Sequence, residues 1–307
     1  MSELPDVTVY VERLRPRVQG QPLEKARVRS AFLVRSFDPP LSDAEGREVV
    51  AVSRMGKRIV FGLQGDLHLV FHLMITGRFR WRDRGVAVPK KMGLAAFDFP
   101  AGSLLLTEMG PRKRASLHLV RGEGLPDHDP GGLEPLDCAL ADFRAALLRG
   151  NHTLKRALTD PRAFSGIGNA YSDEILHRAR LSPLRWTTQL GDDEIERLWA
   201  AATATRAEGT GRLRAEVGDG FPEKVTAFRE GMAVHGRYRK PCPDCGAPVQ
   251  RIVYAENETN YCARCQTGGR MLADRALSQL LKKDWPKTLE EWEALRGGGE
   301  EGVRGPE

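Results

Sequence analysis

Four of the five cysteines have the spacing of metal ligands. Cys242 and Cys245 form one CxxC pair, Cys262 and Cys265 form a second, and sixteen residues separate the pairs. This spacing is close to that at which four thiolates close a tetrahedral zinc site. Four thiolates leave no open coordination position, so the sequence predicts one structural Zn²⁺. Cys138 stands alone in an apolar segment and is predicted to be a core residue.

The segment between the two CxxC pairs predicts a β-hairpin. VQRIVYA and ETNYC form its two strands, joined near residues 256–258, so that the metal would fix a small finger. The alternatives to a zinc site are that the two CxxC pairs occur by accident or that they form a redox pair. The finger is flanked by basic residues that suit phosphate contacts or, equally, a solvated surface: Arg229, Arg237, Arg239, Lys240, Arg251, Arg264 and Arg270.

The elements that must position this finger differ along the chain. The first 130 or so residues carry short apolar stretches separated by Gly, Pro and Asp, which is typical of a β-sandwich or barrel. Residues 6–18 fit either a strand or a helix, because their apolar positions satisfy both periodicities. Glycines and prolines cluster at residues 122–132 and predict a domain boundary near residue 130.

A mostly helical region follows this boundary. Asp137 and Asp192 are predicted helix caps. Helical spacing is present over residues 137–148, 151–158, 170–179 and 192–207. The residues after Pro286 begin as a short helix, and the chain ends in a polar tail that cannot bury a core.

Composition limits the class of protein. The 307 residues suit two or three domains, and 41% hydrophobic with 29% charged residues exclude a mostly disordered chain. No apolar run reaches the ~18 residues of a membrane span, and the N-terminus lacks a signal-like segment, so a cytoplasmic protein without membrane contact is expected. A net charge of +6 permits a polyanionic partner without requiring one.

Three segments together resemble one family. They are SELPDV at the start, GIGNAYSDEIL with LSP over residues 166–183, and PCPDCG with NYCARCQ over 241–266. In this order they resemble the formamidopyrimidine-DNA glycosylase and endonuclease VIII family of base-excision repair enzymes, over about residues 2–270.

The resemblance implies an α+β multidomain fold. A leading helix and a β-sandwich form the catalytic domain, a helix-two-turns-helix domain binds DNA, and a zinc β-hairpin finger follows. The implied limits are 1–130, 131–234 and 235–273, with a partly disordered C-terminal extension over 274–307. The resemblance also favours a helix for the ambiguous start.

The resemblance further implies the catalytic groups. The family uses the α-amine exposed when Met1 is removed, which here belongs to Ser2 instead of the usual proline. An α-amine titrates near ~8, so a useful fraction is neutral and nucleophilic. Glu3 matches the glutamate that protonates the sugar ring oxygen, and Asp6 stands where a glutamate is usual.

Further residues match DNA contacts of the family. Lys57 matches the lysine that contacts phosphate beside the lesion and can steady developing negative charge, so it is the third implied catalytic residue after Ser2 and Glu3. His72 matches a histidine that contacts the DNA backbone, and Asn169 matches the asparagine of the helix-two-turns-helix that binds phosphate. Gly166 and Gly168 would permit close backbone approach.

Three more residues stand where the family fills the gap left by an extruded base: Ile75, Arg112 and Arg114. Ile75 and Arg114 depart from the family's methionine and phenylalanine, and Asn257 replaces an arginine near the finger tip.

The implied function is a DNA repair glycosylase that excises damaged, oxidised bases, with or without abasic-site lyase activity. Its partner would be damaged DNA, duplex or partly single-stranded, and it would act as a monomer, at the nucleoid if bacterial. The alternatives are a non-catalytic binder of lesions or unusual DNA and, third, an RNA-associated zinc protein. The RNA-associated alternative leaves the SELPDV start unexplained.

Overall fold

The computed structural model describes residues 2–110, 112–223, 230–254, 257–273, 279–280, 282 and 285–297. The chain divides into two compact units. Unit 1 contains residues 1–136, 161–168 and 206–226, and unit 2 contains residues 137–160, 169–205 and 227–307. Each unit is described by itself below.

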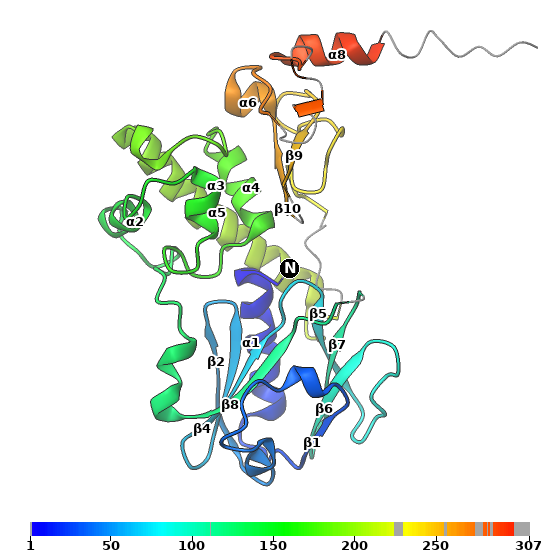
Figure 1. The fold of residues 1–307 in the computed structure, drawn as a ribbon. Helices are drawn as coiled ribbons and strands as arrows, with labels where there is room; N and C mark the ends of the chain where they lie inside the picture. The colour runs from blue at the N-terminus through cyan, green and yellow to red at the C-terminus, as the bar shows by residue number, and fades with distance from the viewer. Residues whose placement is uncertain are drawn as a thin grey trace, which may run out of the picture. The chain divides into compact units, whose positions relative to one another are not determined.

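Unit 1 is a sandwich of two antiparallel four-stranded sheets (Figure 1). One sheet has the order β1 (Lys25–Val28), β6 (Gly93–Phe99), β7 (Gly102–Glu108) and β5 (Gly77–Arg82). The other has the order β2 (Val49–Met55), β3 (Arg58–Leu63), β4 (Leu67–His72) and β8 (Ser116–Arg121). Short 3₁₀ helices lie between β1 and β2, namely η1 (Ala31–Leu33) and η2 (Leu41–Ala44), and after β8, namely η3 (Gly122–Gly124) and η4 (Pro126–His128). The predicted β-sandwich is confirmed.

Aromatic side chains fill the core of the sandwich. The Phe71 ring lies 5.1 Å from that of Phe97 and 5.3 Å from that of Phe79, both edge to face. Such contacts add to the free energy that burial of large apolar side chains supplies. The core therefore gives a rigid base to the turns that connect the strands.

Helix α1 (Leu4–Val18) settles the ambiguous start of the chain in favour of a helix. Its apolar positions form a buried face that packs on β2 and β3. Glu3 is the N-cap, and its backbone N–H donates to the Asp6 carboxylate at 2.8 Å, which closes a capping box. Ser2 and Glu3 therefore immediately precede the helix.

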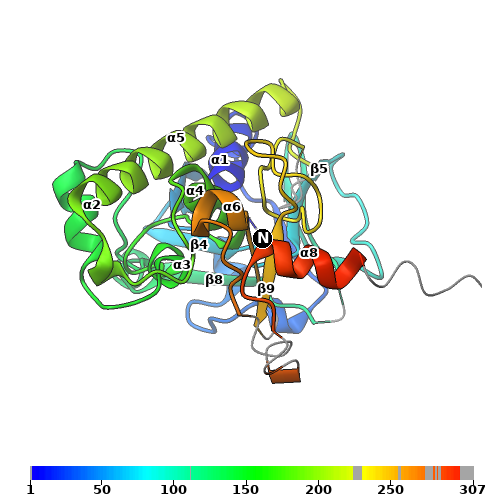
Figure 2. The same ribbon diagram turned by 90° about the horizontal axis from the view of Figure 1, so that it is seen from above.

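Unit 2 combines helices with a hairpin. Its helices are α2 (Leu140–Leu147), α3 (Leu154–Thr159), α4 (Asn169–Arg178), η5 (Thr187–Gln189), α5 (Asp192–Val217), α6 (Ala263–Thr267) and α8 (Leu289–Gly297). Strands β9 (Gln250–Tyr254) and β10 (Asn257–Tyr261) pair antiparallel as the predicted finger hairpin. Figure 2 shows α5 as one long unbroken helix, and its residues from Arg206 onward belong to unit 1.

Three helix limits differ from the sequence prediction by three residues or more, and one of them is the start of α3 at Leu154 instead of residue 151. Helix α2 begins at Leu140, and its N-cap Ala139 makes no side-chain capping bond, so the prediction of Asp137 as cap was wrong. Cys138 precedes the helix and is only half-buried, and its carbonyl accepts the indole N–H of Trp199 at 3.2 Å. Helix α5 continues ten residues past Ala207, because glycines inside a helix weaken it without ending it.

The fold class and the C-terminal helix agree with the sequence prediction, whereas the domain limits are not tested. The α+β class is confirmed, and α8 corresponds to the short helix expected after Pro286. The exact domain limits stay a prediction, and residues 274–278, 281, 283–284 and 298–307 of the C-terminal extension lie outside the described residues. None of the described helices has the length and apolar character that a membrane span requires.

Candidate active site and metal centre

The start of the chain is held in place by a loop from a distant part of the sequence. The backbone N–H of Ser2 donates to the carbonyl of Met74 at 3.3 Å, and that of Leu4 donates to the carbonyl of Gly166 at 2.9 Å. The Glu3 carboxylate accepts the N–H of Gly168 at 2.8 Å. All these residues belong to unit 1, so three consecutive residues are fixed to the same body.

The glycines of this loop are required by the close approach. A Cβ at Gly168 would lie 2.5 Å from Cδ of Glu3, and one at Gly166 would lie 2.8 Å from Cβ of Leu4. Gly166 also has a φ of +75°, which other residues rarely adopt. A side chain at Gly168 would displace Glu3 and one at Gly166 would displace Leu4, so both glycines are needed to position the start of the chain.

Asp6 has a structural partner at this site. It is buried, and its carboxylate accepts the backbone N–H of Glu3. The same pair of residues thus caps the helix and fixes the backbone from which the Glu3 side chain extends. Asp6, which stands where a glutamate is usual in the family, therefore has a polar role at the start of α1.

A pocket of about 170 Å³ lies in unit 1 beside the GIG loop. Lys57 reaches it from the turn between β2 and β3, and His72 reaches it from the end of β4, opposite Arg58 in the sheet register. Its lining is completed by Gly56, Arg58, Asp129, Pro130, Gly132, Pro161, Ser165 and Gly166. The structure therefore brings Lys57 and His72 together with the loop that holds Glu3.

Burial controls the charge of both side chains. Desolvation lowers the pKa of Lys57, and the negative charge of Glu3 partly opposes this effect. Desolvation also lowers the pKa of His72 to about 4, with further lowering by Arg58, Lys57 and His118. His72 is therefore neutral at physiological pH and can both donate and accept a hydrogen bond.

The three residues predicted to fill the place of an extruded base lie on two turns of unit 1. Ile75 is 40% exposed and follows Met74, whose φ is +54°. Arg112 and Arg114 lie between β7 and β8, where the Glu108 carboxylate accepts the backbone N–H of Arg114 at 2.9 Å. The turns expose an apolar tip and a basic one, which is the chemistry expected of a wedge in DNA.

One supporting network was not found from the sequence. Arg54 donates to Glu134 at 2.6 Å, and Ser165 donates to the same carboxylate. Although burial alone would raise it, these hydrogen bonds hold the pKa of Glu134 below its usual value. The network fixes Ser165, next to Gly166. Since its members lie 80 and 31 residues from Glu134, no local pattern could reveal it.

Asn169 opens α4 in unit 2. Its side-chain amide donates to the carbonyl of Glu258 in β10 at 2.8 Å. This contact fixes the side-chain amide of Asn169. The N-terminus of α4 supplies backbone N–H groups of the kind that bind phosphate. The side chain of Asn257 lies outside the described residues.

Two buried acids of α4 fix the segment before the zinc finger. The Glu174 carboxylate accepts backbone N–H groups from Ala233, Val234 and His235 at 2.6 to 2.9 Å. Asp173 lies 2.7 Å from Nδ1 of His235 and accepts the backbone N–H of Asn260 at 3.1 Å. Helix α4 therefore connects Asn169 to the finger through several charge-assisted bonds.

The four cysteines form the predicted metal site. Their sulfur atoms lie within 4.8 Å of one another, with 3.9 Å between Cys242 and Cys265 and 3.4 Å between Cys245 and Cys262. Tetrahedral Zn²⁺ with bonds of ~2.3 Å places its sulfur ligands ~3.8 Å apart, so these residues fit the ion. The predicted structural zinc site is confirmed. Nε2 of His177, on α4, lies 3.2 Å from Sγ of Cys242.

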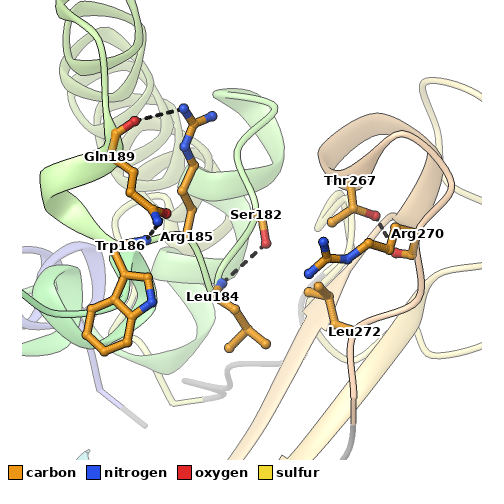
Figure 3. A pocket seen from close by; sticks show the side chains of 8 residues that line it. All are labelled: Ser182, Leu184, Arg185, Trp186, Gln189, Thr267, Arg270 and Leu272. Atoms are coloured by element: carbon orange, nitrogen blue, oxygen red, sulfur yellow. Dashed lines mark hydrogen bonds between the residues drawn. The ribbon is translucent and has the colours of Figure 1, made fainter. Parts of the chain in front are cut away.

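A second pocket, of about 580 Å³, lies in unit 2 (Figure 3). Trp186 and Leu184 face Arg270 and Leu272 across it. The loop after α4 supplies one wall and the residues around the end of α6 supply the other. None of its lining residues belongs to α4 itself.

Comparison with known proteins gives matches over most of the chain. Residues 1–117 match the family model described as formamidopyrimidine-DNA glycosylase N-terminal domain, and residues 132–212 match the formamidopyrimidine-DNA glycosylase H2TH domain. Residues 239–268 match the zinc finger found in FPG and IleRS. A formamidopyrimidine-DNA glycosylase from Thermus thermophilus is 36% identical over 278 residues, 88% of this chain and 100% of that protein.

Solved structures resemble the chain to a similar extent. The crystal structure of the MutM (Fpg) protein from Thermus thermophilus has a TM-score of 0.73 and 35% identity, and the likeness covers 86% of this chain and 98% of that one. A complex of the Lactococcus lactis Fpg with DNA that contains an abasic site has a TM-score of 0.76. This second likeness covers 86% of this chain and 99% of the Lactococcus lactis chain at 24% identity. It shows a shared fold.

Proposed function

The chain belongs to the formamidopyrimidine-DNA glycosylase family and is a DNA repair glycosylase, and we propose that it removes oxidised bases with the α-amine of Ser2 as nucleophile. The observation that carries the proposal is the hydrogen bond between the Glu3 carboxylate and the N–H of Gly168. It fixes a buried acid next to Ser2 and beside the pocket that contains Lys57 and His72.

The first step is attack on the sugar. Once Met1 is removed, the neutral amine of Ser2 attacks C1′ of the damaged nucleoside, and the bond from C1′ to the base breaks. The amine titrates near ~8, which keeps a useful fraction unprotonated at neutral pH. A protein that retained Met1 would carry its amine one residue away from this position.

Glu3 supplies the proton for the second step. A protonated carboxyl group donates to the ring oxygen of the sugar, the ring opens, and the amine is left as an imine with C1′. Glu3 is buried directly beside Ser2, which places its carboxyl group next to the proposed nucleophile. Elimination of the flanking phosphates can then break the strand, which would make the protein a bifunctional glycosylase and abasic-site lyase.

The DNA backbone is bound by polar groups from separate parts of the chain. In this proposal Lys57 and His72 contact the phosphates beside the lesion, and Asn169 contacts a phosphate through the start of α4. Ile75, Arg112 and Arg114 occupy the gap that the extruded base leaves. The partner is therefore damaged DNA. A monomeric state and a cytoplasmic location stay predictions.

When bound, Zn²⁺ supplies folding free energy to the finger, and it takes no part in the reaction. The protein's own residues do the binding: the carbonyl of Glu258 in β10 accepts the amide of Asn169, and Lys240, Arg251 and Arg264 of the finger are exposed. No observation favours the alternative of a non-catalytic DNA binder over an enzyme.

The test is covalent trapping. The purified protein is incubated with DNA that contains an abasic site and with borohydride, which reduces an imine to a stable amine. We expect an adduct whose DNA-linked peptide begins at Ser2, and none when the α-amine is chemically blocked. Tight DNA binding without any adduct would contradict the proposed nucleophile, and linkage to a lysine would move it elsewhere.

A further inference from the structure

The hydroxyl group of Ser2 is buried and has no hydrogen-bond partner among the described residues. Ser2 is only 3% exposed, and its Oγ contacts no donor or acceptor in that part of the chain. Its backbone N–H, in contrast, donates to Met74. Because buried hydroxyl groups are nearly always hydrogen-bonded, an unpaired one beside a reactive group calls for a functional explanation.

The position of this hydroxyl relative to the amine suggests its role. Both belong to one residue, so Oγ is separated from the amine nitrogen by only Cα and Cβ. We propose that, once the imine of the proposed function has formed, Oγ adds to its carbon and closes a five-membered oxazolidine ring of N, Cα, Cβ, Oγ and C1′. The proposal rests on Ser2 as the nucleophile.

The step is balanced without any co-reactant. A bond forms between Oγ and C1′, the electron pair of the C=N double bond moves to nitrogen, and the hydroxyl proton is transferred to that nitrogen. Nothing is oxidised or reduced. The ring is an isomer of the imine with the same mass, and it reopens by the reverse path.

Burial makes this site suitable for ring closure. A serine hydroxyl in water would be solvated, and water would compete for the imine carbon. In the chain that still carries Met1, Oγ of Ser2 is instead withdrawn from solvent, and no residue that the structure describes forms a hydrogen bond with it. The ring has no C=N bond, so it cannot acidify C2′ for elimination. We therefore expect the enzyme to excise the base, hold the abasic site and cleave the strand slowly.

The ring can be detected directly. Abasic DNA labelled with ¹³C at C1′ is mixed with the processed protein, and the carbon signal of the adduct is recorded by NMR. We expect a tetrahedral carbon for the wild type and for Ser2→Thr, which keeps the hydroxyl, but a trigonal imine carbon for Ser2→Ala. Since Ser2→Ala removes a hydroxyl that contributes no described hydrogen bond, its fold should be preserved, as a thermal melt would verify.

The outcomes separate this proposal from the proposed function. Intact mass reports the adduct whatever its form, so an adduct with a trigonal carbon in the wild type overturns the ring and leaves Ser2 as nucleophile. No adduct in any of the three proteins overturns both. A second readout is trapping, because borohydride reduces only the imine: Ser2→Ala should be trapped, and should cleave the strand, several-fold faster than the wild type. Equal rates would contradict the ring.

Discussion

Glu3 carries two roles that one substitution can separate. Its carboxylate accepts the N–H of Gly168, which is structural, and it is the proposed proton donor. Glu3→Gln keeps an acceptor for Gly168 but cannot donate the proton, so the fold should persist. We expect base excision to fall by about 10²- to 10⁴-fold, the usual value of general acid catalysis, in a single-turnover assay.

The matched control is Glu12→Gln on the same helix. Glu12 pairs with Arg214 at the surface, 2.6 Å away, and has no place in the site. Its loss should leave excision unchanged. If both variants lost activity equally, the effect would come from α1 and the acid role of Glu3 would be wrong.

His72 should make stability depend on pH. Its pKa of about 4 lies below the ordinary 6.5, so the unfolded chain binds more protons between these values. The stability that neutral His72 contributes is complete above pH 6.5 and is lost as the pH falls toward 4. For this half-buried side chain the loss is about 2 kcal/mol.

The measurement compares the wild type with His72→Gln, which cannot titrate. Denaturant unfolding at pH 7 and pH 4.5 should show a smaller drop in the variant. Burial also lowers the pKa values of His118 and His128. Part of the loss of stability at pH 4.5 should therefore remain in both proteins. Identical pH dependence in the two proteins would mean that His72 is not desolvated as described.

The site residues differed in how far the sequence could predict them. The cysteines were predictable because a metal restricts residue type and spacing together. Glu3 was found only through resemblance, since nothing local distinguishes it from a surface acid. The clamp of Arg54 and Ser165 on Glu134 was missed, because its members meet only after the chain has folded.

At the level of elements, α4 joins two functions along its length. Its N-terminal residue Asn169 contacts the finger hairpin and is proposed to bind phosphate, and its C-terminal end leads to the pocket of Figure 3. The acids between them hold the segment before the finger. A helix of ten residues thereby fixes the orientation of the finger hairpin within unit 2.

Asn169 and the pocket of Figure 3 should differ in their effect on DNA binding. Asn169→Ala removes a proposed phosphate contact and should weaken binding of abasic-site DNA, whereas Arg270→Ala, in the pocket lining, should not. The measurement is fluorescence anisotropy at several salt concentrations. If Arg270→Ala reduced the salt slope by about one unit, as loss of a phosphate contact does, the DNA would pass the pocket instead.

Helix limits were the least predictable part of the fold. Helix α5 contains Gly209 and Gly211, which indicate an end, yet it continues to Val217. Its later turns pack within unit 1, where Thr210 and Leu213 are buried and Arg214 pairs with Glu12 of α1. Tertiary contacts of this kind outweigh the cost of ~1 kcal/mol for each glycine, and they are invisible to a local pattern.

At the scale of the whole molecule, each unit has an apolar cluster among its described residues. That of unit 1 fills the sandwich, and that of unit 2 surrounds Cys242 and Cys262. The second is small and includes the metal ligands, so it depends on Zn²⁺ for its free energy of folding. Removal of the metal should therefore destabilise one unit selectively.

Calorimetry can test this dependence. A strong chelator, or Cys262→Ser, should lower or abolish the thermal transition that belongs to the finger region, while the transition of the sandwich remains. DNA affinity should fall with the first transition, because Asn169 loses its contact with Glu258 when β10 unfolds. Restoring Zn²⁺ should reverse the effect of the chelator but not that of Cys262→Ser.

Two outcomes would contradict this prediction. A single transition that shifts as a whole would show that the metal stabilises the entire chain. Unchanged DNA affinity without zinc would show that the finger is not part of the DNA-binding surface.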